Sequence, residues 1–144
     1  MFAVDRSAVL WVFAGGMAGA PARYAIGEWW PVDDGGLPWP TLVINVGGAF
    51  ALGLLLSVLT DGTVGRPLKP ESARRKRLRL LAGTGFLGAF TTYSGFAVEL
   101  DLLVHAGRAG LALGYAALAL SGGVLAVTAG IALGIGWSRR RMRT

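Results

Sequence analysis

The sequence contains no cysteine and a single histidine, His105, among its 144 residues. Without cysteine the chain can form neither a disulfide framework nor a thiolate metal site. One imidazole has no second imidazole with which to share a metal ion, so a histidine-carboxylate metal cluster is not indicated. We find no phosphate-binding glycine loop, catalytic triad or pair of intramembrane carboxylates. The sequence therefore gives no support for an enzyme.

Charge is scarce as well, since 15% of the residues are charged and 53% are hydrophobic, with a mean hydropathy of +0.56. The charged residues cluster and leave four long uncharged windows, at residues 7–22, 35–60, 80–98 and 109–138. A membrane-spanning helix needs about 20 apolar residues. We predict an all-α membrane protein of one domain, residues 1–144, with four spans at about 7–26, 38–60, 79–99 and 109–138.

A cleaved signal peptide is the alternative for the first window. The flank of that window carries an acid beside its only base, Asp5 and Arg6, and three further windows follow. Both features favour a retained span.

The basic residues are distributed unevenly between the two sides of the predicted membrane domain. Of the 14 Lys and Arg residues, 12 lie before the first span, in the basic loop 61–79 or in the basic tail 139–144. Lys and Arg are enriched in cytoplasmic loops. We therefore predict a multi-pass protein of the cell membrane with both termini in the cytoplasm. The high isoelectric point, about 10.8, follows from these loops and does not indicate a nucleic-acid partner. Binding of lipid headgroups by the basic loop is a less favoured alternative to a role in topology.

Residues 83–96 form the most unusual segment, because four glycines and several hydroxyl groups lie inside the third uncharged window. Hydrocarbon cannot hydrogen-bond to exposed backbone or hydroxyl groups, so such a segment must be buried in protein or line a wet pathway. The composition predicts that the third helix is broken in mid-membrane. A break frees carbonyls that can coordinate a cation and amides that can face an anion.

Other polar and aromatic residues of the predicted spans allow both a functional and an ordinary interpretation. Asn45, in the second span, can form an interhelical hydrogen bond or donate to an anion. Tyr93 and Phe96 share a helix face, and their ring edges can stabilise a small anion weakly or simply pack. Arg23, at the edge of a span, can concentrate anions at a pore mouth. Tyr115 can offer a pore-side hydroxyl.

Three blocks of the sequence resemble motifs of the Fluc (CrcB) family of small fluoride channels. Residues 15–24 resemble its GGxxGAxxRY motif, residues 41–53 its TLxVNxxGxFxLG motif, and residues 83–99 its GFxGGxTTFSTFxxE motif. The blocks occur in the family's order and spacing, and the resemblance covers nearly the whole chain.

The resemblance implies a passive, fluoride-selective channel subunit that lets fluoride leave the cytoplasm, in an antiparallel dimer with two pores. It implies a structural Na⁺ at the dimer interface, bound by the main-chain carbonyls of Gly88 and Thr91. Arg23 would lie by a vestibule, and the role of Glu99, which matches the motif glutamate, stays open. The residues along the fluoride path would be Asn45, Thr92, Tyr93, Ser94, Phe96 and Tyr115.

The sequence departs from the family pattern at hydroxyl and aromatic positions. Tyr93 replaces a phenylalanine, Gly95 a threonine and Ala119 a serine. A non-conducting structural subunit of a fluoride channel is therefore an alternative. A small multidrug-type exporter is a weaker one, because that chemistry needs a membrane-embedded carboxylate, and spans one, two and four contain none.

The uneven distribution of Lys and Arg also bears on the partner. A chain with this bias should insert in one orientation. We predict that its antiparallel partner is a homologue with the reverse bias, while a dual-topology homodimer stays open.

Overall fold

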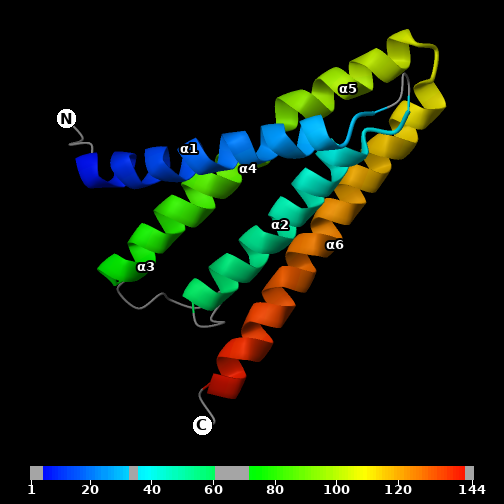
Figure 1. The fold of residues 1–144 in the computed structure, drawn as a ribbon. Coiled ribbons are helices and arrows are strands. Elements are labelled where there is room, and N and C mark those ends of the chain that lie inside the picture. Colours follow the sequence, from blue (N-terminus) through cyan, green and yellow to red (C-terminus); the bar gives the residue numbers. More distant parts are fainter. Residues whose placement is uncertain (1–4, 33–35, 61–71, 142–144) are drawn as a thin grey trace.

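The computed structural model describes residues 5–32, 36–60 and 72–141, and these are helical almost throughout (Figure 1). Helices α1 (Arg6–Trp29) and α2 (Trp39–Leu59) are followed by a third helical segment, residues 73–105, and by the long helix α6 (Ala109–Arg141). The third segment consists of α3 (Ala73–Leu78), the π-helix η1 (Arg79–Leu87), α4 (Gly88–Phe90) and α5 (Tyr93–His105). The all-α prediction is confirmed. Residues 61–71 of the predicted basic loop and 142–144 of the tail lie outside the described residues.

Two of the described helical stretches, α2 and residues 109–138 of α6, are long and apolar enough to cross a membrane. They coincide with the second and fourth predicted spans. The first and third predicted spans fall on α1 and on the third segment, which do not meet the same criterion of length and apolarity. The spans at 7–26 and 79–99 therefore stay predictions.

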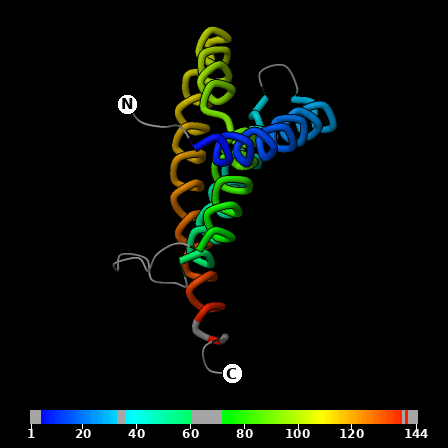
Figure 2. The backbone as a smooth tube through the Cα atoms, turned by 90° about the vertical axis from the view of Figure 1, so that its left-hand side faces the viewer, coloured from blue at the N-terminus to red at the C-terminus, as the bar shows by residue number. Residues whose placement is uncertain are grey.

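The helices pack as two pairs, α2 with α6 and α1 with η1 and α4. Figure 1 shows that α1 crosses the third segment near α4, and Figure 2 shows α5 beside the first half of α6. Both pairs are in backbone contact at glycines. A methyl group on Gly85 would lie 2.9 Å from Gly15 Cα, and one on Gly130 would lie 2.8 Å from Leu54 N. Small residues allow such close approach between helices.

The third segment is broken, as predicted, but the break is shorter than the sequence indicates. The helix runs without interruption through Gly83, Gly85 and Gly88 and ends only at Thr91 and Thr92. Both residues have extended backbones, with ψ of 157° at Thr91 and 124° at Thr92. The break lies inside residues 83–96, where the composition predicts it, and Gly83 and Gly85 belong to the π-helix that precedes it. A glycine is tolerated inside a helix when close packing compensates, and Gly85 meets the backbone of α1.

After the break, α5 packs against α6, and the chain reverses direction between these two helices in a turn at Gly107, whose φ is 74°. A buried cluster of Leu42, Leu103, Ala112 and Tyr115 joins α2, α5 and α6. Large apolar side chains elsewhere remain exposed, including Leu113, Leu120, Leu125 and Leu133 on α6. An isolated soluble chain rarely exposes so much apolar surface, so lipid or a partner must cover it.

Candidate functional site

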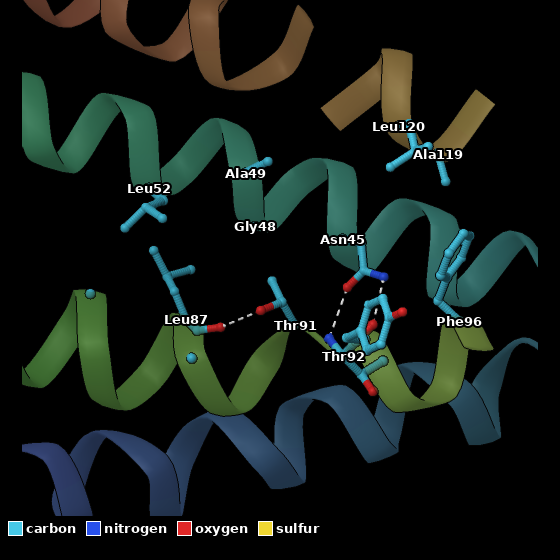
Figure 3. A pocket seen from close by; sticks show the side chains of 13 residues that line it. Asn45, Gly48, Ala49, Leu52, Leu87, Thr91, Thr92, Phe96, Ala119 and Leu120 are labelled. Atoms are coloured by element: carbon cyan, nitrogen blue, oxygen red, sulfur yellow. Dashed lines mark hydrogen bonds between the residues drawn. The ribbon is translucent and has the colours of Figure 1, made fainter. Parts of the chain in front are cut away.

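The break in the third segment is held by a side chain from α2. The Asn45 amide forms two hydrogen bonds with the peptide groups of one residue: Nδ2 donates to Thr92 O at 2.9 Å, and Thr92 N donates to Oδ1 at 2.8 Å (Figure 3). The interhelical hydrogen bond that the sequence left open is therefore present. Asn45 also lines a groove, so its side chain borders a cavity while it forms these hydrogen bonds.

A second side chain, from α1, meets the same break. Arg23 Nε donates to Ala89 O at 3.1 Å. In an unbroken α-helix this carbonyl would accept the amide of Tyr93, so the arginine satisfies an acceptor that the break has freed. Arg23, predicted to lie by a vestibule, is partly buried against the third segment.

Two further carbonyls at the break, those of Gly88 and Thr91, lose their helical donors. In an unbroken α-helix Thr92 N would donate to Gly88 O, and Gly95 N would donate to Thr91 O. Thr92 N instead donates to Asn45, and Gly95 N donates to Thr92 Oγ1 at 3.0 Å. A methyl group at Gly88 would meet nothing within 4 Å, so this part of α4 faces out of the chain.

The freed carbonyls are the groups that fit a cation here. Carbonyl oxygens at a helix break are suitable ligands for Na⁺. The described residues contain no group of three or more His, Cys, Asp and Glu side chains that could hold a metal ion. The donor set at Gly88 and Thr91 therefore fits Na⁺ and not a transition metal.

An open groove of about 430 Å³ runs beside the break, between α2, the third segment and α6. Asn45, Thr91, Thr92 and Tyr93 bring polar groups to it, and Ala119 and Leu120 of α6 form an apolar wall (Figure 3). The groove thus combines amide and hydroxyl groups with apolar surface.

Tyr93 and Phe96 share a face of α5 and both line the groove, as their spacing predicts. Their ring centroids lie 6.4 Å apart, with the ring planes tilted by 46°. Tyr93 is 82% exposed, whereas Phe96 is partly buried and packs on Tyr115 at 5.3 Å. Ser94 is exposed, and its hydroxyl lies 3.3 Å from Thr92 Oγ1. Ser94 is therefore next to the break but is not part of the groove wall.

Tyr115, predicted to lie on the ion path, is fully buried in this chain. Its hydroxyl donates to Glu99 Oε2 at 2.7 Å, and Thr41 Oγ1 donates to Glu99 Oε1. Glu99, whose role the sequence left open, accepts a hydrogen bond from each of two other helices. Thr41 was not singled out by the sequence reasoning. Its position four residues before Asn45, on the same face of α2, was the available signal.

A broken helix with freed main-chain groups, beside a groove of amide, hydroxyl and aromatic groups, defines a small ion-handling membrane protein. The model of the family described as CrcB-like protein, Camphor Resistance (CrcB), matches residues 10–131. The chain belongs to this family, and the resemblance seen in the three sequence blocks is confirmed.

Curated relatives match most of the chain. The fluoride-specific ion channel FluC 2 of Nocardia farcinica is 41% identical over 94% of this chain and 88% of its own length. The FluC 2 protein of Leifsonia xyli subsp. xyli is 44% identical, over 92% of this chain and 87% of its own. The fluoride-specific ion channel FluC of Deinococcus radiodurans is 44% identical, over 87% and 93%.

Proposed function

We propose that the chain is a subunit of a fluoride-selective channel that lets fluoride leave the cytoplasm passively and so limits its toxicity. The observation that carries the proposal is the groove in which the Asn45 amide, the helix break and the rings of Tyr93 and Phe96 meet. This groove lies in a chain whose family relatives are named fluoride-specific ion channels.

The groove offers fluoride weak and dispersed stabilisation. An amide nitrogen carries two protons, and Asn45 uses one of them for Thr92 O, so the second can point at an anion. Thr92 lines the groove with Asn45, and the hydroxyl of Ser94 lies beside that of Thr92, outside the groove wall. The positive ring edges of Tyr93 and Phe96 attract an anion without binding it tightly. Conduction needs such sites, because an ion that is held too firmly does not leave.

The carbonyls of Gly88 and Thr91 would hold the structural Na⁺ of the proposed channel. Both have lost their helical donors, and the Gly88 segment faces open space at the surface of the chain. A cation bound there supplies positive charge at the contact between two subunits. Tyr115 and Glu99 lie behind the aromatic face and hold α5 against α6.

We further propose that the channel is an antiparallel dimer in the cell membrane, with both termini of this chain in the cytoplasm. One chain forms only an open groove, and its apolar faces are uncovered. Because 12 of 14 Lys and Arg lie on the predicted cytoplasmic side, every copy should insert in the same orientation. An oppositely oriented homologue is therefore the favoured partner, in place of a second copy.

Fluoride efflux from liposomes, followed with a fluoride electrode, tests the proposal. The chain is reconstituted alone and with a co-expressed homologue of the opposite charge bias, and the heterodimer is expected to conduct. Fluoride efflux by purified dimers of this chain alone would contradict the heterodimer but not the function. Absence of efflux in both preparations would contradict the channel itself.

A non-conducting structural subunit is the second candidate, and one observation favours it. Ala119, which lines the groove, brings no hydroxyl to this wall. Replacing Tyr93 and Phe96 in the assembled complex distinguishes the two candidates. A conducting subunit should lose efflux, whereas a purely structural one should leave efflux unchanged.

A further inference from the structure

The helix break does not follow from its two threonines alone. A threonine can stay helical by bonding to a carbonyl one turn earlier, and Thr91 does so. Its hydroxyl donates to Leu87 O at 2.9 Å, and its amide donates to the same carbonyl at 3.0 Å. Helical hydrogen bonding therefore continues up to the amide of Thr91 and stops at the next amide, that of Thr92.

The amide of Thr92 is the group that Asn45 binds. The same side chain also donates to Thr92 O, so one extended residue has both of its main-chain groups satisfied. Backbone groups away from water must be paired, and an asparagine amide carries a donor and an acceptor at one end, as a peptide does. Asn45 thus replaces the helical partners of Thr92.

Helix α2 also provides the space that this arrangement needs. Gly48, one turn after Asn45, is buried, and a methyl group there would overlap the methyl group of Thr91. Asn45 and Gly48 lie three residues apart, on one face of α2. Asn45 binds the backbone of Thr92, and Gly48 leaves room for the methyl group of Thr91, so this face of α2 accommodates the extended pair Thr91–Thr92.

We propose that Asn45 is a positioning residue for the cation site, because its hold on the Thr92 amide keeps the carbonyl of Gly88 unpaired and open to Na⁺. The proposal rests on the proposed function, in which that carbonyl is a Na⁺ ligand. It adds to the role of Asn45 toward fluoride. The Asn45 side chain then has two roles. One N–H can donate to fluoride, and the oxygen binds the Thr92 amide and so keeps the cation site open.

Removal of the amide has a definite consequence. Without Oδ1, the Thr92 amide loses its acceptor and is paired again when the helix continues by one residue onto Gly88 O. A carbonyl that accepts an amide proton is a poorer cation ligand. Loss of Asn45 should therefore weaken Na⁺ binding as well as fluoride transport.

The test measures thermal unfolding of the purified complex without fluoride, as NaCl replaces choline chloride at constant ionic strength. Na⁺ should raise the unfolding temperature of the wild type. In Asn45→Leu, which keeps the number and branching of the side-chain heavy atoms, the Na⁺ concentration for half-maximal stabilisation should rise by about tenfold or more. Tyr93→Ala is the matched control: its fluoride efflux should fall while its Na⁺ response stays that of the wild type.

Asn45→Asp keeps the test decisive if the leucine variant does not fold. The carboxylate still accepts the Thr92 amide but offers no N–H to Thr92 O or to fluoride. The Na⁺ response, which depends on the amide, should persist while efflux falls. Loss of the Na⁺ response in Asn45→Asp, or a wild-type response in Asn45→Leu, would overturn the positioning role alone. A wild type that conducts fluoride but shows no Na⁺ response would overturn the cation site and the positioning role together. Absence of wild-type efflux would instead concern the proposed function.

Discussion

The two halves of the broken third segment pack in opposite ways. Before the break, η1 meets α1 backbone to backbone at Gly15 and Gly85. After the break, α5 meets α2 and α6 through side chains. Phe96 packs on the ring of Tyr115, and Glu99 accepts hydrogen bonds from hydroxyl groups on both helices. The packing of the first half depends on glycines, which have no side chain. The packing of the second half depends on side chains that contact one another.

The difference suits the two tasks of the proposed channel. Close backbone packing holds the segment before the break in place and leaves open space at Gly88. Side-chain packing after the break leaves one face of α5, with Tyr93 and Ser94, exposed. Adding atoms should therefore damage the first half, and removing atoms should damage the second.

Adding atoms at Gly85 should give the largest effect on stability. In Gly85→Val the side chain would lie within 3 Å of Gly15 Cα on α1. Helix α1 and η1 must then separate, at a cost of about 3 kcal/mol or more. We expect little or no monodisperse protein in size-exclusion chromatography after detergent extraction.

Gly27→Ala is the matched control for this prediction. Gly27 also lies in a helix, but a methyl group there meets nothing within 4 Å. The alanine variant should elute and unfold as the wild type does. Equal loss of both variants would contradict the role assigned to the backbone contact.

Removing atoms at Glu99 tests the second half. In Glu99→Ala the buried hydroxyl groups of Tyr115 and Thr41 lose their acceptor. An unsatisfied buried polar group costs about 1–3 kcal/mol, so the free energy of unfolding should fall by about 2–3 kcal/mol. Thermal unfolding in detergent measures the change. Asp101→Ala on the same helix is the control, since Asp101 is exposed and its replacement should have almost no effect.

The sequence allowed the main features of the fold to be predicted, because uncharged windows and glycine spacing are local signals. It predicted the all-α class and the broken third segment. The break lies inside the predicted segment 83–96. Its exact position at Thr91 and Thr92 could not be predicted, because glycine weakens a helix in an isolated chain, whereas the approach of α1 to Gly85 depends on tertiary packing.

The hydrogen-bond partners of the site could not be predicted in the same way. The pairs Asn45–Thr92, Arg23–Ala89 and Tyr115–Glu99 join residues that are 47, 66 and 16 positions apart. Residue types indicate that a polar group in the membrane needs a partner, but only the helix packing decides which partner it meets. Thr41 was missed for this reason.

The two aromatic residues of α5 separate stability from transport. Phe96 packs on Tyr115, so Phe96→Ala should cost about 2 kcal/mol. Tyr93 is exposed, so Tyr93→Ala should change stability by no more than about 0.5 kcal/mol. Loss of its ring edge should still reduce fluoride efflux by about tenfold, which corresponds to about 1.4 kcal/mol. Unfolding and efflux are measured on the same preparations, and a destabilised Tyr93→Ala variant would contradict this separation.

We expect the smallest effect on stability at α3, the start of the third segment. There α3 meets the start of α1 through an ion pair. Lys76 Nζ lies 2.8 Å from Asp5 Oδ2, and both side chains are nearly half exposed. Asp5 also caps α1, because its Oδ1 accepts the amide of Ser7. Asparagine is an equally good cap, so Asp5→Asn removes only the charge, whereas Asp5→Ala removes the charge and the cap. Exposed ion pairs contribute little, and Asp5→Ala should therefore lower the unfolding temperature more than Asp5→Asn does.

The pH dependence gives this last comparison a second measurement. The hydrogen bond from Lys76, and then that from Ser7, hold the pKa of Asp5 well below its usual value of 3.8. A carboxyl whose pKa is lowered by folding stabilises the folded state above its ordinary pKa, and the contribution is lost as the pH falls through the folded value. The wild type and Asp5→Asn should therefore differ equally at pH 7 and pH 5, and the difference should shrink below pH 4 and in high salt. A difference that changes between pH 7 and pH 5 would show that a group other than Asp5 is titrating.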